Sequence, residues 1–318
     1  MRRVRPSFAP LLLAAWSAAC AAPAPNSALR WDLQEGRSLT LHTHERPVWS
    51  FVFAADADKP HFHPLALPGG ASLTVDAPAD HRWHHGLWFS WKFVNGVNYW
   101  EHAGKTGRSA GRTAWTVESL RTHEDGRAEL ALRVAYGPEG QPLLQEQRQL
   151  SIGAPAESGS YAIDWDATFV ATVPCELDRT PLPGEPGGQA FGGYAGLSVR
   201  LAQLDDRDAL TTTAPVAFNA QDRFRGTADA FDYRGVLDGR EVGIAVLSHR
   251  DNPRSPSPWY AIRSRDMSFF TPAPLVPGKW LLEQGESLRL RYRIVVHPGR
   301  WSPDQLAAAH AEYQAAKP

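Results

Sequence analysis

Hydrophobic and polar residues alternate along most of the chain after residue 28, and helical spacing is scarce. The alternating runs are rich in Val, Leu, Ile and aromatic residues, and Gly, Pro and Asp end them, as is typical of strands joined by turns. The clearest runs occupy residues 143–152, 161–173, 197–201, 259–270 and 287–296. This pattern predicts an all-β protein built from long antiparallel strands.

Two further segments have the pattern of β-hairpins. Residues 116–135 contain an Asp-Gly pair at 125–126, and residues 231–248 contain one at 238–239. An Asp-Gly pair favours a tight hairpin turn because it tolerates the positive φ angles that such a turn needs. We therefore expect strand–turn–strand units in both places.

The C-terminus is the one segment with a helical pattern. Ser302 is a good N-cap residue, Pro303 suits the first helical position, and residues 306–316 are rich in Ala. Two stacked sheets would bury the Trp-rich faces of the strands most simply. We predict a large antiparallel β-sandwich closed by a short helix, formed by residues 29–318 as one domain because no repeat or composition break divides them.

The first 21 residues have the pattern of a signal peptide. Arg2, Arg3 and Arg5 precede an apolar run at 8–19 that is shorter than the roughly 20 residues of a bilayer span. Cleavage after Ala21 satisfies the rule of small residues, whereas cleavage before Cys20 resembles a lipoprotein signal. Residues 22–28, rich in Pro and Ala, then form a tether. The sequence predicts an exported protein, either periplasmic or anchored to a membrane through a lipid on Cys20.

Composition excludes several classes of protein. The chain has 318 residues, of which 43% are hydrophobic and 21% charged, with 12 Trp and a formal net charge of −1. A chain of this kind buries a sizeable core, so it is neither disordered nor collagen-like. Binding to nucleic acid is not expected, because it depends on concentrated Lys and Arg. With two cysteines, Cys20 and Cys175, the fold is not a disulfide scaffold.

Candidate chemistry is concentrated in residues 60–101. Five of the twelve histidines lie within this stretch: His61, His63, His81, His84 and His85. Histidine transfers protons near neutral pH and binds transition metals, so this density indicates a functional site.

Two kinds of site are compatible with the cluster. In the first, His84 or His85 is a general acid or base that works with a carboxylate and needs no cofactor. In the second, His61, His63, His81 and either His84 or His85 bind one divalent transition metal, with Asp76, Asp80 or Glu101 available as a further ligand. The spacing matches no specific metal motif.

The segment that follows the histidines has two faces if it is extended. Leu87, Phe89, Trp91 and Phe93 form a core face, while His84, Trp88, Ser90 and Lys92 lie on the other. Trp88 either stacks on a ligand or covers the far side of the sheet. An Asn-Gly turn at 95–96 follows, and Asn98, Trp100 and Glu101 come close behind it with amide, indole and carboxylate groups.

Further polar candidates lie on later strands. Glu146 and Arg148 share a face, either as part of a site or as a surface ion pair, and Asp164 and Asp166 also share one. His249 follows the hydrophobic strand at 242–247, which makes it a second catalytic candidate.

Several segments together resemble one family of secreted bacterial proteins, the PmoA-like or "methane oxygenase" family. They are residues 63–65, 80–89, 94–97, Glu146 with Arg148, 193–200, His249 with 252–253, Trp259 and 290–297. The resemblance covers nearly the whole chain after the signal. It departs at Gly86, which follows His85 directly where an additional Arg is expected. The chain has no series of spanning segments, so we do not expect a methane monooxygenase subunit.

The resemblance implies a domain of unknown function that accompanies sugar-degrading enzymes, in a sandwich similar to the galactose-mutarotase supersandwich. We therefore expect a lyase, hydrolase or epimerase acting on a carbohydrate. The alternatives are a His-cluster metalloenzyme and a non-catalytic sugar-binding lipoprotein. The predicted catalytic residues are His84, His85, Glu146 and His249. The predicted substrate-binding residues are His63, Asp80, His81, Trp88, Asn95, Asn98, Arg148, Tyr194 and Trp259.

Overall fold

A computed structural model describes residues 29–316. The predicted signal peptide, the tether and Cys20 lie outside these residues, so export stays a prediction. Among the described residues, no helix has both the length and the apolar character that a membrane span requires.

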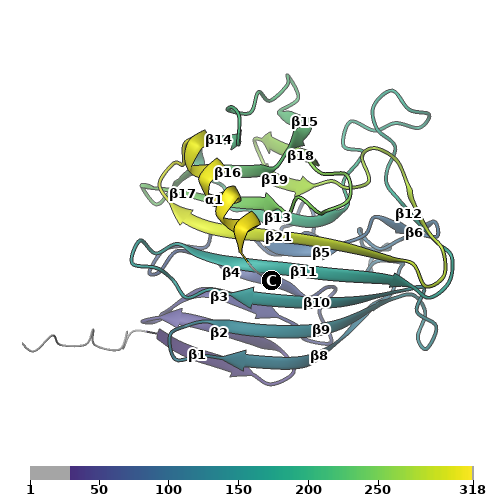
Figure 1. Cartoon of the computed structure of the whole chain (residues 1–318), viewed down its shortest axis with the longest axis horizontal. Coiled ribbons are helices and arrows are strands. Elements are labelled where there is room, and N and C mark those ends of the chain that lie inside the picture. The colour runs from purple at the N-terminus through teal and green to yellow at the C-terminus, as the bar shows by residue number, and fades with distance from the viewer. Residues whose placement is uncertain (1–28, 317–318) are drawn as a thin grey trace, which may run out of the picture.

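The first large sheet has nine antiparallel strands and includes the N-terminal strands β1 to β5 (Figure 1). Its order joins the N-terminal strands β1 to β5 directly to β13, so that the His-rich segment lies in the middle of the sheet. In spatial order the strands are β1 (Leu29–Gln34), β2 (Ser38–Thr43), β3 (Arg46–Val52), β4 (His61–Leu65), β5 (Leu87–Ser90), β13 (Gly196–Leu201), β19 (Met267–Pro272), β18 (Ser257–Ser264) and β15 (Arg223–Ala228).

The second large sheet has eight antiparallel strands, several of them nine residues or longer. In spatial order they are β14 (Asp205–Thr211), β16 (Ala230–Leu237), β17 (Arg240–Ser248), β21 (Ser287–Pro298), β11 (Tyr161–Ala171), β10 (Leu144–Ile152), β9 (Ala128–Tyr136) and β8 (Thr113–Thr122). A small third sheet consists of β20 (Trp280–Leu282), β12 (Cys175–Asp178), β6 (Phe93–Val94) and β7 (Val97–Asn98).

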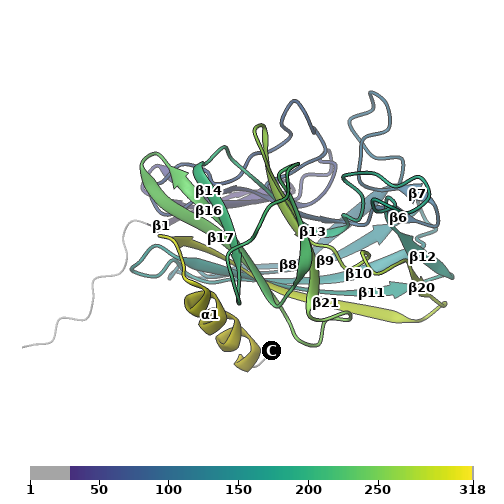
Figure 2. The same ribbon diagram turned by 90° about the horizontal axis from the view of Figure 1, so that it is seen from above.

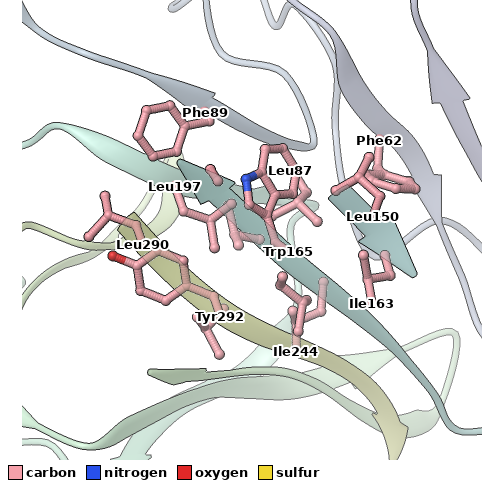
Figure 3. Close-up of a cluster of buried hydrophobic side chains, with 14 of the residues drawn as sticks. Phe62, Leu87, Phe89, Leu150, Ile163, Trp165, Leu197, Ile244, Leu290 and Tyr292 are labelled. Carbon is pink, nitrogen blue, oxygen red and sulfur yellow. The ribbon is translucent and has the colours of Figure 1, made fainter. Parts of the chain in front are cut away.

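The two large sheets pack face to face around the main hydrophobic core (Figure 3). Phe62 of β4 meets Trp165 of β11 with ring centroids 6.4 Å apart, and Phe89 of β5 meets Phe169 at 5.1 Å. These rings are fully or almost fully buried. The sandwich is therefore held together by apolar side chains that interleave from both sheets.

Each large sheet also has a smaller hydrophobic cluster on its outer face. On the nine-stranded sheet this cluster contains Trp88, Trp100, Tyr260 and Phe269. On the eight-stranded sheet, Leu306 and Tyr313 of the helix α1 (Pro303–Ala315) pack onto Leu210, Ala230, Ala245 and Leu247. Figure 2 shows α1 outside the sandwich. The molecule thus has one polar-rimmed aromatic patch on one outer face and a covering helix on the other.

The predicted sandwich with a short C-terminal helix is confirmed. Both hairpins form, as β8–β9 and β16–β17, with Asp238 in the positive-φ conformation at φ 50°. The helix begins after Ser302, whose hydroxyl accepts a hydrogen bond from the backbone N–H of Gln305 in a capping box. One expectation was wrong: residues 259–270 are not one strand but parts of β18 and β19, which pair as a hairpin.

Candidate functional site

An open pocket of about 300 Å³ lies on the outer face of the nine-stranded sheet, over β18 and β19 and the loops around residues 81–84 and 100–101. Neighbouring residues on these strands point to opposite faces, so Phe270 enters the main core while Phe269 faces the pocket. Aromatic rings form most of the lining, which consists of His81, Trp83, His84, Trp100, Glu101, Phe191, Tyr194, Arg223, Tyr260, Ile262, Ser264, Met267 and Phe269.

Glu101 brings a firmly held carboxylate to this pocket. The carboxylate accepts hydrogen bonds from the Lys92 ammonium, the Tyr194 hydroxyl and the Asn98 amide, the last at 2.7 Å. The Asn98 side-chain oxygen in turn accepts from the backbone N–H groups of Trp100 at 2.8 Å and Glu101 at 3.2 Å. Asn98 therefore fixes both the loop and the carboxylate that it carries.

The surroundings of Glu101 keep it ionised. Burial alone would raise its pKa, but the Lys92 charge and the three hydrogen bonds together lower it below the usual value. Burial and the neighbouring Glu101 charge raise the pKa of Tyr194, so its hydroxyl keeps its proton and donates a hydrogen bond to the carboxylate. At neutral pH the pocket thus contains an anionic hydrogen-bond acceptor beside a neutral phenol.

His84 forms another part of the pocket wall. Its ring stacks with His81 at 4.7 Å and with Phe269 at 5.3 Å, and it lies 5.1 Å from Trp88. Burial, reinforced by the charges of His81 and Arg200, holds the pKa of His84 well below its usual range. Its Nδ1 atom is buried and has no hydrogen-bond partner among the described residues. The uncharged ring therefore has a free polar atom.

Asp80 positions the loop that carries His84. Its carboxylate accepts from the Arg200 guanidinium of β13 at 2.9 Å and lies 2.8 Å from His81 Nδ1. Arg200 also donates to the Asp266 carbonyl at 3.1 Å, in the turn between β18 and β19. The ion pair joins three segments that are distant in sequence. Asp80, which was predicted to bind substrate, thus fixes the loop that forms the pocket wall but does not line the pocket.

His85 and His63 do not line the pocket. His85 contacts the edge of Trp88, with ring centroids 6.3 Å apart, and its Nδ1 atom lies 2.6 Å from Asp76. The His63 Nδ1 atom lies 3.0 Å from the Thr74 hydroxyl. Trp88 itself is fully buried beneath His84 and Trp100, so it supports the pocket floor.

Gly86 allows the histidine loop to enter β5. A Cβ atom at this position would lie 2.3 Å from the Phe62 carbonyl oxygen and 3.0 Å from the Thr74 hydroxyl. A side chain at position 86 would therefore collide with the backbone of β4. The absence of a side chain at Gly86 also explains how the histidine pair can lie so close to β4.

We expect Gly86→Ala to lower the free energy of unfolding by about 1–3 kcal/mol, because the added methyl group must displace the backbone of β4. Gly153→Ala is the control, since its Cβ would meet nothing closer than 3.6 Å. Urea unfolding measures both changes. Equal midpoints for the two variants would show that the close contact at Gly86 is unimportant.

Three predicted site residues point into the interior of the sandwich and do not line the pocket. Glu146 and Arg148 are completely buried between the sheets, where the Glu146 carboxylate accepts from Arg148 and from the Tyr136 hydroxyl at 2.6 Å. Of the two alternatives, the surface ion pair is wrong because both side chains are buried, and neither side chain lines the pocket as the predicted site role requires. Trp259 also points into the main core, with its indole N–H donating to the Ala228 carbonyl at 2.8 Å.

His249 lies on the opposite outer face from His84. Its ring packs edge-on against Tyr313 of α1, with ring centroids 5.5 Å apart. It borders a separate cavity of about 390 Å³ that includes Asp164 and Asp166. Because the whole sandwich separates the two histidines, they do not act on the same ligand.

Asn95 is a turn residue. It has φ 48° between β6 and β7, its amide donates to the Pro174 carbonyl at 3.2 Å, and its side-chain oxygen accepts from the Glu176 N–H at 2.7 Å. These bonds hold the β6–β7 turn against β12.

Of the predicted site residues, the structure brings together His81, His84, Asn98 and Tyr194 at the pocket.

The predicted set lacked the pocket carboxylate and much of the aromatic wall. The available signal for Glu101 and Trp100 was their position just after the Asn-Gly turn, close to the histidines. Tyr260 and Phe269 had no such signal, since only the pairing of β18 with β19 and β13 places them beside residues 81–101.

No curated protein matches the chain. Among solved structures, a Klebsiella pneumoniae protein provisionally described as an aldose 1-epimerase is 11% identical, with 89% of this chain and 86% of that chain covered and a TM-score of 0.46. A Geobacillus stearothermophilus GH36 α-galactosidase in complex with raffinose is 12% identical, with 90% and 35% covered and a TM-score of 0.32. Heparan sulfate lyase HepC from Pedobacter heparinus is 9% identical, with 83% and 31% covered and a TM-score of 0.31.

The chain thus spans about a third of the length of the galactosidase and the lyase. Fold and site together define a two-sheet β-sandwich protein with an aromatic, carboxylate-bearing pocket on one outer face. The chain belongs to the family of unknown function DUF6807, whose model matches residues 38–311. The PmoA-like name remains a prediction.

Proposed function

We propose that this protein is an exported carbohydrate-active enzyme and that the pocket over β18 and β19 is its active site. The observation that carries the proposal is an ionised carboxylate, Glu101, held at the wall of a pocket whose other walls are largely aromatic. Glu101 acts as the base, and His84 is the second polar group that contacts the sugar. A positioned carboxylate base can remove a proton in a lyase or epimerase reaction and can activate water in a hydrolase reaction.

The lining suits a sugar ring. Trp83 and Phe191 are the more exposed rings of the lining and offer flat apolar faces, against which the C–H face of a sugar packs, while a few polar groups orient its hydroxyls. Arg223 contributes a guanidinium whose Nη1 donates weakly to the Tyr260 hydroxyl at 3.4 Å. Aromatic area with a few fixed polar groups is what a small-molecule pocket requires for both affinity and orientation.

The test is a thermal-shift screen of the mature protein against monosaccharides, oligosaccharides, uronates and keto-sugars, followed by NMR of each mixture for new products. A ligand at about 100 times its Kd adds roughly 2.7 kcal/mol of stability, which raises Tm by a few degrees in a protein of this size. We expect one sugar class to raise Tm and to be converted. Absence of any shift and any product would overturn the proposal, and binding without conversion would leave a non-catalytic sugar-binding protein.

A matched pair of variants locates the binding. Phe191 lines the pocket and is 45% exposed, so Phe191→Ala is expected to weaken the sugar-induced shift without lowering Tm in the absence of sugar. Leu281 is 61% exposed and does not line the pocket, so Leu281→Ala should change neither value. Equal sugar responses in both variants would place the sugar elsewhere.

A further inference from the structure

A second cluster of polar side chains lies next to the pocket, on the other side of Trp88. It consists of His61 at the start of β4, Asp76 in the loop after β4, and His85 just before β5. One ligand atom from each residue lies within 4.8 Å of the others. None of the three lines the sugar pocket, so the cluster is a site of its own.

The two imidazole rings present one nitrogen each to the same carboxylate. They stack with centroids 4.5 Å apart and planes 25° apart. His61 Nε2 lies 3.6 Å from Asp76 Oδ1, and His85 Nδ1 lies 2.6 Å from the same oxygen. Nitrogen and oxygen atoms bound to one transition-metal ion at 2.0–2.2 Å would have similar separations, on the order of 3–3.5 Å.

The nitrogen on the far side of the His61 ring has an outer hydrogen-bond partner, and that of the His85 ring faces a carboxylate. His61 Nδ1 lies 2.8 Å from the Lys59 carbonyl oxygen, which sets this N–H as donor and leaves Nε2 with its lone pair. His85 Nε2 is buried, makes no hydrogen bond within residues 29–316, and lies 3.8 Å from an Asp58 carboxylate oxygen. Metal-binding histidines commonly have a carbonyl or carboxylate on the second nitrogen, which fixes the tautomer and orients the ring.

Charge and access also fit a cation. Asp58 and Asp76 are the carboxylates around the rings and Lys59 is the ammonium, so the cluster is net negative when the imidazoles are neutral. The side chains of His61 and His85 are 6% and 8% exposed, whereas that of Asp76 is 34% exposed. An ion can therefore enter past Asp76 and keep an open position toward solvent.

We propose that His61, Asp76 and His85 bind one divalent transition-metal ion, of the class of Zn²⁺ or Fe²⁺. Two imidazoles with one carboxylate are a ligand set that these ions take, and three protein ligands leave coordination positions for water. Of the histidines that the sequence offered as ligands, the set contains His61 and His85 and lacks His63 and His81, because His81 stacks on His84 at the pocket instead. The metal site does not depend on the sugar pocket.

The test uses the mature protein, stripped of metal by a chelator and titrated near neutral pH with Zn²⁺ in a calorimeter and with Co²⁺ by visible absorption. We expect one ion per chain and the strong visible bands of four- or five-coordinate Co²⁺. His61→Gln and Asp76→Asn should each weaken Zn²⁺ binding by more than about 100-fold, and Asp58→Asn by about 10–100-fold as an outer partner.

The control is His42→Gln. His42 Nε2 also lies near a carboxylate, 3.9 Å from Asp32, yet no third ligand joins it in the described residues, so this variant should bind Zn²⁺ like the wild type. If a cluster variant does not fold, X-ray absorption of the Zn²⁺-loaded wild type counts the imidazole ligands, and two are expected. The proposal would be overturned if the wild type showed no saturable binding of Zn²⁺, Fe²⁺ or Co²⁺. It would also be overturned if folded His61→Gln bound Zn²⁺ with unchanged affinity, or if the ligands of the bound Zn²⁺ included no imidazole.

Discussion

Glu101→Gln is expected to lower kcat/KM by about 10²–10⁴-fold on the sugar that the screen identifies, which is the usual contribution of a general base. The amide has nearly the shape of the carboxylate but cannot take up a proton. It also cannot hold a charge beside the Lys92 ammonium. The measurement is steady-state kinetics together with Tm, because a loss of activity in a folded variant assigns the effect to the chemistry.

Lys92→Met is the companion variant, and it tests the charge state of Glu101. In the wild type the ionised carboxylate is the active form and its pKa is lowered, so activity should persist to a pH below the usual range of a Glu and fall only beneath it. Removing the ammonium raises the pKa of Glu101, so the acid limb of the pH–rate profile should move to higher pH while activity above it is retained. An acid limb that stays in place in Lys92→Met would rule out Glu101 as the base.

Arg148→Ala is expected to lower the free energy of unfolding by about 3–5 kcal/mol, the largest stability effect among these variants. The Arg148 guanidinium lies 1% exposed between the sheets, donates to both Glu146 oxygens at 2.6 and 2.9 Å, and stacks 4.5 Å from the Trp165 ring. Its removal leaves the Glu146 charge buried with only the Tyr136 hydroxyl as partner. Urea unfolding of Arg148→Ala and of the wild type measures this cost.

The double variant Glu146→Leu/Arg148→Met distinguishes the stability cost of losing the whole ion pair from the cost of leaving one buried charge without its partner. Since it leaves no unpaired charge in the core, it should be far more stable than Arg148→Ala. It should also retain turnover, because neither side chain reaches the pocket. A folded double variant without activity would restore the catalytic role predicted for Glu146 from the sequence.

Local pattern was a good guide wherever neighbours in sequence decide the structure. Alternation in residues 116–135 and 231–248 predicted hairpins, since the Asp-Gly turn and the strand period are properties of a few adjacent residues. The capped helix after Ser302 was predicted for the same reason. The clustering of histidines within 25 residues likewise pointed to a stretch in which His81 and His84 line the pocket and His61 and His85 meet at Asp76.

Alternation also separates the two faces of a strand, but it does not say which face is covered by the other sheet. Glu146 and Arg148 were correctly predicted to share a face, yet only the packing of the nine-stranded sheet makes that face the core. Trp259 and Tyr260 are adjacent, and one enters the core while the other lines the pocket. A shift of one residue exchanges those positions, so local pattern alone left them undecided.

The sequence by itself determined the β-sandwich class, the hairpins, the C-terminal helix and the histidine-rich region, because strand period, turn residues and caps act over short distances. Only the tertiary structure decided which histidines come together. His61 and His85 both contact Asp76, whereas His81 stacks on His84 at the pocket. The tertiary structure also decided that Glu101 is the pocket carboxylate and that Tyr194 and Tyr260 join it. These contacts join strands that are far apart in the chain and paired in the sheet, and their geometry follows from sheet order and register rather than from neighbouring residues.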